Sequence, residues 1–132
     1  MSFFIDILPI GREEKIMKKT KMLKKNYEFK NVLSKGKYYS GRNIEAFVKD
    51  NNKKCNFLGL AISVKTAKAV RRNKIKRLIR ENYKLQELNI KSGKSIVFLW
   101  KKNVDIKNAT FENIRDDMNT IFDKAKIINR EI

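Results

Sequence analysis

Apolar residues along this chain follow two different spacings, which separates predicted strands from predicted helices. Residues 57–64 (FLGLAISV) and 95–100 (SIVFLW) are short runs that are almost entirely apolar, as is typical of strands buried on both faces of a sheet. Residues 44–49 also read as a strand, and residues 37–40 can form another. The polar cluster at residues 50–54 then predicts the loop of a hairpin.

Three further segments repeat their apolar residues at helical spacing. The first runs from Asn26, its expected N-cap, to Gly36, which lies just past its end. The second covers residues 69 to about 88, and the third follows Thr110, its expected N-cap. The predicted order is α-β-β-β-α-β-α, an α+β sandwich with its helices on a four-stranded mixed sheet. The second helix joins two strands, and general chain chirality predicts a right-handed crossover there.

The start of the chain matches none of these patterns. We expect residues 1–17 to form an extension outside the core, and residues 18–132 to form one domain. Residues 11–17 correspond to what a purine-rich ribosome-binding site and its spacer would encode if translated in frame. We therefore expect the natural start to be Met17, which is followed directly by basic residues.

The charge of the chain indicates the kind of partner that it binds. Thirty-two Lys and Arg residues against fourteen Asp and Glu residues leave a formal net charge of +18 in 132 residues. A small domain tolerates such self-repulsion best when its usual partner is a polyanion, and nucleic acid is the first candidate. The chain contains no apolar run of about 18 residues and no lipidation motif. We therefore expect one nucleic-acid-binding domain with no membrane contact.

The residue types that are missing exclude several kinds of catalysis. The chain has one cysteine, Cys55, and no histidine, which is typical of the reducing cytoplasm. It therefore lacks the residues for Ser-His-Asp or Cys-His catalysis and for Cys/His zinc sites. The adjacent pairs Glu13-Glu14 and Asp116-Asp117 do not suit a metal site, because neighbours on a helix point in different directions. We expect no catalytic residues and no metal ligands on this protein.

The predicted helix that starts at residue 69 carries its cations on one side. On a helical wheel the apolar side holds Ile75, Leu78, Ile79 and Leu85, and the polar side holds Arg72, Asn73, Lys76, Arg77, Arg80 and Lys84. Like charges four residues apart cost a few tenths of a kcal/mol each, so this pattern favours a ligand over helix stability. Arginine binds phosphate oxygens through two parallel hydrogen bonds. Such contacts read the shape of a folded nucleic acid more than its sequence.

A second group mixes aromatic and cationic residues around the first helix and the strands. It contains Phe29, Tyr38, Tyr39 and Phe47 among Lys25, Lys30, Lys35, Lys37, Arg42 and Lys65. Single-stranded nucleic acid is bound by this combination of stacking and charge neutralisation. The alternative is that Phe29 and Phe47 belong to the core.

These motifs resemble a known family. The pattern Arg72-Asn73-x-x-Lys76-Arg77-x-x-Arg80, preceded by Ala69-Val70, resembles the signature helix of the bacterial ribonuclease P protein subunit. Residues 23–29 with Gly36 look like the first helix of that family, and residues 59–63 look like its third strand. The resemblance covers about residues 19–128.

The resemblance implies the fold predicted above with one change, since this family has an uncommon left-handed β-α-β crossover around the basic helix. It also implies that catalysis belongs to an RNA subunit, whose bound Mg²⁺ ions activate the water that removes the 5′ leader from precursor tRNA. The protein would raise the affinity for the precursor and for functional metal ions. No protein partner is required, and the expected location is the cytoplasm.

The resemblance also assigns residues to two surfaces. Contacts with the RNA subunit are implied for Arg72, Asn73, Lys74, Lys76, Arg77, Arg80 and Lys84. Contacts with the single-stranded leader are implied for Phe29, Leu33, Phe47, Lys65, Lys25 and Arg42. The chain departs from the family at Leu33, where an aromatic residue is common, at Val64, where a basic residue is usual, and at Ala67, where glycine is usual. The rival interpretation is a non-enzymatic RNA-binding protein, such as a ribosomal or architectural component.

Overall fold

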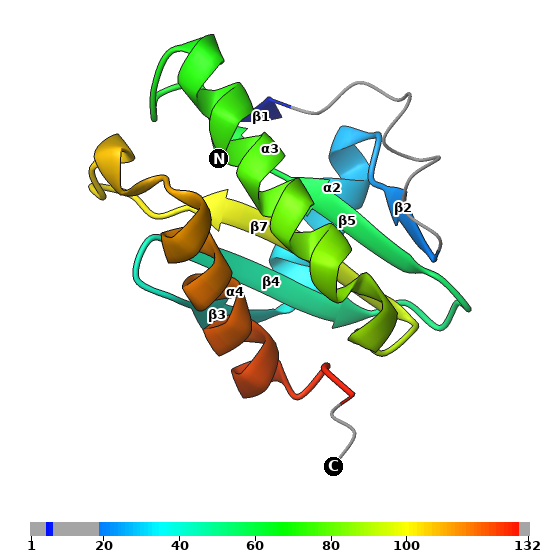
Figure 1. Ribbon diagram of the computed structural model, residues 1–132. Coiled ribbons are helices and arrows are strands. Elements are labelled where there is room, and N and C mark those ends of the chain that lie inside the picture. Colours follow the sequence, from blue (N-terminus) through cyan, green and yellow to red (C-terminus); the bar gives the residue numbers. More distant parts are fainter. Residues whose placement is uncertain (1–4, 7–18, 130–132) are drawn as a thin grey trace.

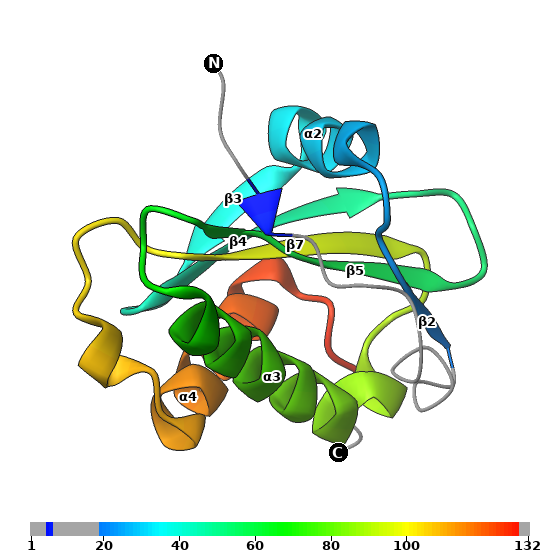
Figure 2. The ribbon, with the colours of Figure 1, turned by 90° about the horizontal axis from the view of Figure 1, so that it is seen from above.

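The computed structural model describes residues 5, 6 and 19–129. They form a five-stranded sheet with the strand order β2-β5-β7-β4-β3. Helix α2 covers one face of this sheet, and helices α3 and α4 cover the other (Figures 1 and 2). The helices are α2 (Asn26–Lys35), α3 (Ala69–Gln86) and α4 (Phe111–Ala125), with 3-10 turns η1 (Glu87–Asn89) and η2 (Ile106–Asn108). The strands of the sheet are β2 (Thr20–Met22), β3 (Lys37–Ser40), β4 (Ile44–Asp50), β5 (Asn56–Leu60) and β7 (Lys94–Trp100).

This architecture confirms the predicted α+β class and adds strands that the apolar pattern did not show. Strand β2, of three residues, pairs in parallel with β5 at the edge of the sheet, which makes it five-stranded. The apolar run at residues 57–64 is divided at Ala61 into β5 and the short strand β6 (Ile62–Ser63). Strand β1 (Ile5–Asp6), in the predicted extension, pairs antiparallel with β6. The remaining residues of that extension, and the expected start at Met17, lie outside the described residues.

The connection from β5 through α3 to β7 is left-handed. Strands β5 and β7 are parallel neighbours, and α3 lies in front of them in Figure 1. In that view β7 points to the left and lies below β5, whereas a right-handed connection would place it above. The prediction from general chirality is therefore wrong here, and the hand implied by the family resemblance is confirmed.

The sheet separates two apolar cores of unequal size. The larger lies between the sheet and the helices α3 and α4 and includes Ile79, Phe98 and Phe122. The smaller lies under α2 and consists of Leu23, Phe29, Val32, Ala61 and Val97.

The ends of the helices follow ordinary capping chemistry. The Thr110 hydroxyl accepts a hydrogen bond from the Asn113 N–H at 3.2 Å, which confirms it as the N-cap of α4. Helix α2 is capped one residue earlier than expected, at Lys25. The Glu28 carboxylate accepts the Lys25 N–H at 2.9 Å, so Glu28 performs the capping that the sequence assigned to Asn26.

Candidate nucleic-acid interface

Helix α3 places most of its cations on the surface. Ile75, Leu78 and Ile79 are buried against the sheet and α4, as predicted. Arg71, Asn73, Lys74 and Arg77 are exposed, and Arg72, Arg80 and Lys84 are half-buried. Of the seven residues implied for RNA-subunit binding, six therefore have solvent-accessible side chains.

Two positions on the predicted wheel are wrong. Lys76 was expected on the solvent side but is only 1% exposed, and Leu85 was expected in the core but is 72% exposed. The reason is Tyr83, which is fully buried and bonds through its hydroxyl to the Thr20 hydroxyl at 2.8 Å. At about 100° per residue, Tyr83 and Lys76 point in nearly the same direction, so the side of α3 that buries Tyr83 also buries Lys76. Leu85 points past the opposite edge of this buried side and is therefore exposed.

The start of α3 concentrates positive potential. Its first turn contains no acidic residue, and no side chain caps it. The partial positive charge of a helix N-terminus therefore adds to the charges of Lys68, Arg71 and Arg72. One guanidinium nitrogen of Arg72 donates to the Ala67 carbonyl oxygen at 2.6 Å, which orients that side chain.

Further along α3, the charge stays available to a ligand. Arg77 pairs with Glu81 at 3.8 Å, and both side chains are about half exposed. Such an exposed pair contributes little, since solvent screens it. A phosphate could therefore replace Glu81 as the partner of Arg77 at small cost.

Three of the residues implied for leader binding, Phe29, Leu33 and Phe47, lie on the α2 face of the sheet, and one of them is in the core. Phe29 is only 1% exposed and lies in the small core under α2. A Cβ atom added at Gly59 would lie 2.6 Å from Cε1 of its ring, so glycine permits this close approach. The alternative interpretation, Phe29 as a core residue, fits this structure.

Leu33 and Phe47 keep part of their apolar surface accessible on this face. Both are half-buried and pack against the small core. The ring of Phe47 lies 5.3 Å from the ring of the exposed Tyr38, at 58°. The Tyr38 hydroxyl donates to Glu45 at 2.5 Å, and this hydrogen bond raises the pKa of Tyr38. We call Leu33, Tyr38 and Phe47 the Phe47 surface.

The three cations implied for the leader come from three separate elements. Lys25 caps α2, Arg42 lies in the turn between β3 and β4, and Lys65 follows β6. All three are exposed. The structure thus brings Leu33 and Phe47 to one apolar cluster, and the three cations do not belong to that cluster.

The turn that carries Arg42 is held by one buried carboxylate. Asp117 of α4 is 4% exposed. It accepts the backbone N–H groups of Arg42 at 3.1 Å, Asn43 at 2.8 Å and Ile44 at 3.2 Å. A Cβ atom at Gly41 would lie 2.7 Å from Asp117, so both residues are needed for this contact. Three of the roughly four acceptor sites of this carboxylate are thereby used.

Apolar spacing and charge did not identify two aromatic residues near α2. Tyr27 is 66% exposed, and Phe57 is half-buried under Lys53, whose Nζ lies 5.2 Å from the ring centroid. Tyr27 lies in the first predicted helix and Phe57 begins the predicted strand at residues 57–64, and apolar spacing predicts only the secondary structure of these segments. The neighbouring lysines at positions 25, 30, 53 and 54 were the signal that could have found them.

In the part of the chain that the structure describes, neither a metal cluster nor a membrane span is found. No three His, Cys, Asp or Glu side chains of residues 5–6 and 19–129 come together in a group that could hold a metal ion. None of the helices described is both long and apolar enough to span a bilayer.

The fold and the charge of α3 together define a small basic α+β domain with a cationic surface along α3, a form suited to a polyanionic partner. Comparison with known proteins is more specific. The Ribonuclease P family model matches residues 17–126. The ribonuclease P protein component of Alkaliphilus metalliredigens is 32% identical over 113 residues, which cover 86% of this chain and 100% of that protein. The one from Clostridium botulinum strain Loch Maree is 35% identical over 114 residues, with the same coverage.

Solved structures agree with this assignment. The RNase P protein of Staphylococcus aureus superimposes with a TM-score of 0.72 and 31% identity, covering 82% of this chain and 97% of that one. The RNase P protein of Thermotoga maritima gives a TM-score of 0.61 with 25% identity, covering 76% and 94%. The chain therefore belongs to the ribonuclease P protein family, which acts in tRNA processing.

Proposed function

We propose that this protein binds the catalytic RNA of ribonuclease P through α3 and the single-stranded 5′ leader of precursor tRNA through the α2 face of the sheet. In this role it assists the magnesium-dependent removal of the leader. The observation that carries the proposal is the cationic surface of α3, in a chain that belongs to the ribonuclease P protein family.

The α3 side chains can be ranked as contacts for the RNA subunit by how exposed they are. The first contacts are those of the exposed Asn73, Lys74 and Arg77 and of the oriented Arg72. Arg80 and Lys84 extend this surface toward the end of the helix. Lys76 is buried, so its contact with RNA would require a rearrangement around α3.

On the α2 face, the leader would lie on the Phe47 surface. Phe47 and Leu33 offer apolar contact to bases, and the exposed Lys25, Arg42 and Lys65 would supply positive charge from three separate elements. Phe29 would not contact the leader directly; it would support this surface by packing α2 against the sheet.

The reaction itself belongs to the RNA subunit in this proposal. Mg²⁺ bound there supplies the activation of water that hydrolyses the phosphodiester bond. Among residues 5–6 and 19–129, no three His, Cys, Asp or Glu side chains form a group that could hold a metal ion. The protein would contribute by binding and orienting the precursor.

A reconstitution assay tests this function. The protein, a cognate RNA subunit and precursor tRNA are combined over a range of magnesium concentrations. We expect the protein to stimulate cleavage most strongly at low magnesium, because it replaces part of the cationic charge that folded RNA needs. If it does not stimulate cleavage and recovers only ribosomal RNA from a lysate, it is a non-enzymatic RNA-binding protein instead.

A further inference from the structure

A groove on the α2 face has no role in the function proposed above. It lies between α2 and the loop that joins β4 to β5, and its volume is about 610 Å³, within the range of ligand pockets. Its lining includes Tyr27, Lys30, Asn31, Lys53 and Phe57. None of the residues implied for the RNA subunit or the leader lines it.

The groove is separate from the Phe47 surface. On α2, Tyr27 and Asn31 point to the side opposite Leu33, at about 100° per residue. Phe29 and Val32 lie between these two sides and are buried in the small core. A ligand in the groove would therefore leave the Phe47 surface open.

Two aromatic rings are accessible in this groove. Tyr27 is 66% exposed at its rim. Phe57 is half-buried on the small core, with Lys53 above its ring. Exposed aromatic rings combined with lysines are the usual means of binding single-stranded nucleic acid, since every base can stack.

The charge of the groove is positive. Lys30, Lys49 and Lys53 line it, and among the described residues none of the ion pairs involves them. Glu28 is the acidic residue in the lining. Its carboxylate accepts the N–H groups of Lys24 at 3.2 Å and Lys25 at 2.9 Å, so it is engaged in capping α2. The groove is thus complementary to an anion.

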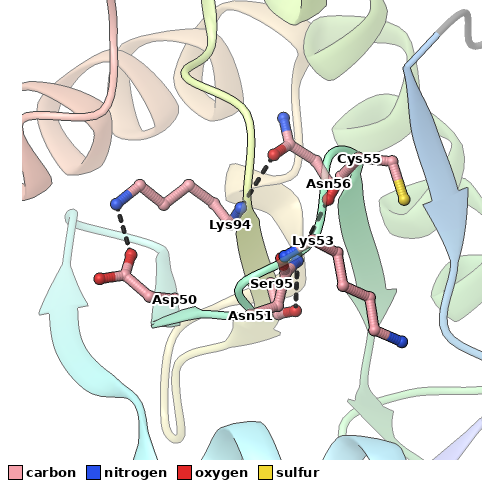
Figure 3. A network of polar contacts seen from close by, with 7 residues as sticks. All are labelled: Asp50, Asn51, Lys53, Cys55, Asn56, Lys94 and Ser95. Carbon is pink, nitrogen blue, oxygen red and sulfur yellow. Dashed lines mark hydrogen bonds and ion pairs between the residues drawn. The ribbon is translucent and has the colours of Figure 1, made fainter.

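The wall formed by the β4–β5 loop is held in place by a polar network (Figure 3). The Asn51 side-chain amide donates to the Cys55 carbonyl oxygen and to the Ser95 hydroxyl, each at 3.2 Å. Its oxygen accepts the Lys53 N–H at 2.8 Å. The Lys53 side chain points away from this network and is free of its hydrogen bonds. The wall is therefore formed before any ligand arrives, which lowers the entropic cost of binding.

We propose that this groove binds a nucleotide of single-stranded RNA, with the base against Tyr27 and Phe57 and the phosphate near Lys30 and Lys53. It is a second RNA site on the α2 face. It goes beyond the proposed leader surface, and its test needs neither the RNA subunit nor the tRNA.

The experiment uses the full chain and a fluorescein-labelled hexauridylate, with binding followed by anisotropy. Tyr27→Ala should weaken binding about fivefold or more through the loss of one stack, while Tyr27→Phe keeps the ring and should bind normally. Lys53→Ala should weaken binding about threefold or more through the loss of one phosphate contact. Lys54→Ala is the matched control, because Lys54 is exposed in the same loop but does not line the groove. Circular dichroism melts establish that each variant is folded.

The position of the bound RNA is tested by cross-linking the protein to a six-nucleotide RNA that contains 4-thiouridine. Mass spectrometry then identifies the cross-linked residues. Cross-links at Tyr27 or Phe57 that persist in Phe47→Ala support the groove. Cross-links confined to Phe47, or equal losses for Lys53→Ala and Lys54→Ala, would overturn it. Neither of those results would affect the stimulation of precursor cleavage, so the two proposals fail separately.

Discussion

The burial of Phe29 leads to a prediction that separates a core residue from a leader-binding residue. Phe29 is 1% exposed, and its ring meets the backbone at Gly59 too closely for any side chain there. Replacing a buried Phe by Ala costs about 3–5 kcal/mol. We expect about 3 kcal/mol for Phe29→Ala, because α2 has only ten residues and can settle partly into the space.

This loss is large for a small domain, whose total stability is about 5–15 kcal/mol. With a urea dependence of about 1.5 kcal/mol per molar, a loss of 3 kcal/mol lowers the unfolding midpoint by about 2 M. The single tryptophan, Trp100, is buried and reports unfolding through its fluorescence. Phe29→Leu keeps most of the volume and should cost about 1 kcal/mol, which provides a folded variant if Phe29→Ala unfolds.

Phe47→Ala is the matched comparison. Phe47 is half-buried, so its removal should change stability by about 1 kcal/mol. In the reconstituted complex it should instead weaken binding of leader-bearing precursor by about 1–3 kcal/mol and spare mature tRNA. If Phe29→Ala keeps its midpoint and loses leader affinity selectively, our reasoning on the α2 face is refuted.

Three further changes test other parts of the structure. Asp117→Asn should lower stability by about 1–3 kcal/mol in urea unfolding, because the amide cannot accept all three N–H groups of the β3–β4 turn as a carboxylate does; an unchanged midpoint would contradict this role. Burial raises the pKa of Tyr83 to about 12 from 10.0, so the unfolded chain loses this proton first and stability should fall as pH rises from about 10 to 12. Tyr83→Phe should flatten that part of the stability profile, and an identical profile would exclude Tyr83 as its cause. Arg77→Ala should weaken RNA-subunit binding by about 1–3 kcal/mol, whereas Lys107→Ala, an equal charge loss at η2, should not; equal losses would mean that net charge alone drives binding.

The local pattern of α3 was enough to predict a helix and its main contacts. Ile75, Leu78 and Ile79 repeat at helical spacing, and all three are buried. The same pattern misplaced Lys76 and Leu85, because it counted aliphatic residues and left out Tyr83. The partner that buries the Tyr83 hydroxyl is Thr20, which lies 63 residues away and belongs to no apolar run.

The candidate site was predicted less completely than the fold. The accessible cations of α3 follow from their position opposite the apolar side: of the six cations implied for RNA binding, only Lys76 is buried. The sequence did not show which of Phe29 and Phe47 is in the core and which is at the surface, because residue type and spacing look the same in both cases. Gly59 decides the matter for Phe29, by letting α2 approach β5.

The sequence by itself determined the class of the fold, the basic amphipathic helix, the absence of histidine chemistry and the resemblance to the ribonuclease P proteins. Each of these depends on residue types and on spacings within one segment. The tertiary structure alone decided the pairing of β2, the burial of Phe29 and Lys76, and the groove beside α2. These depend on contacts between segments far apart in the chain, and local periodicity carries no information about such contacts.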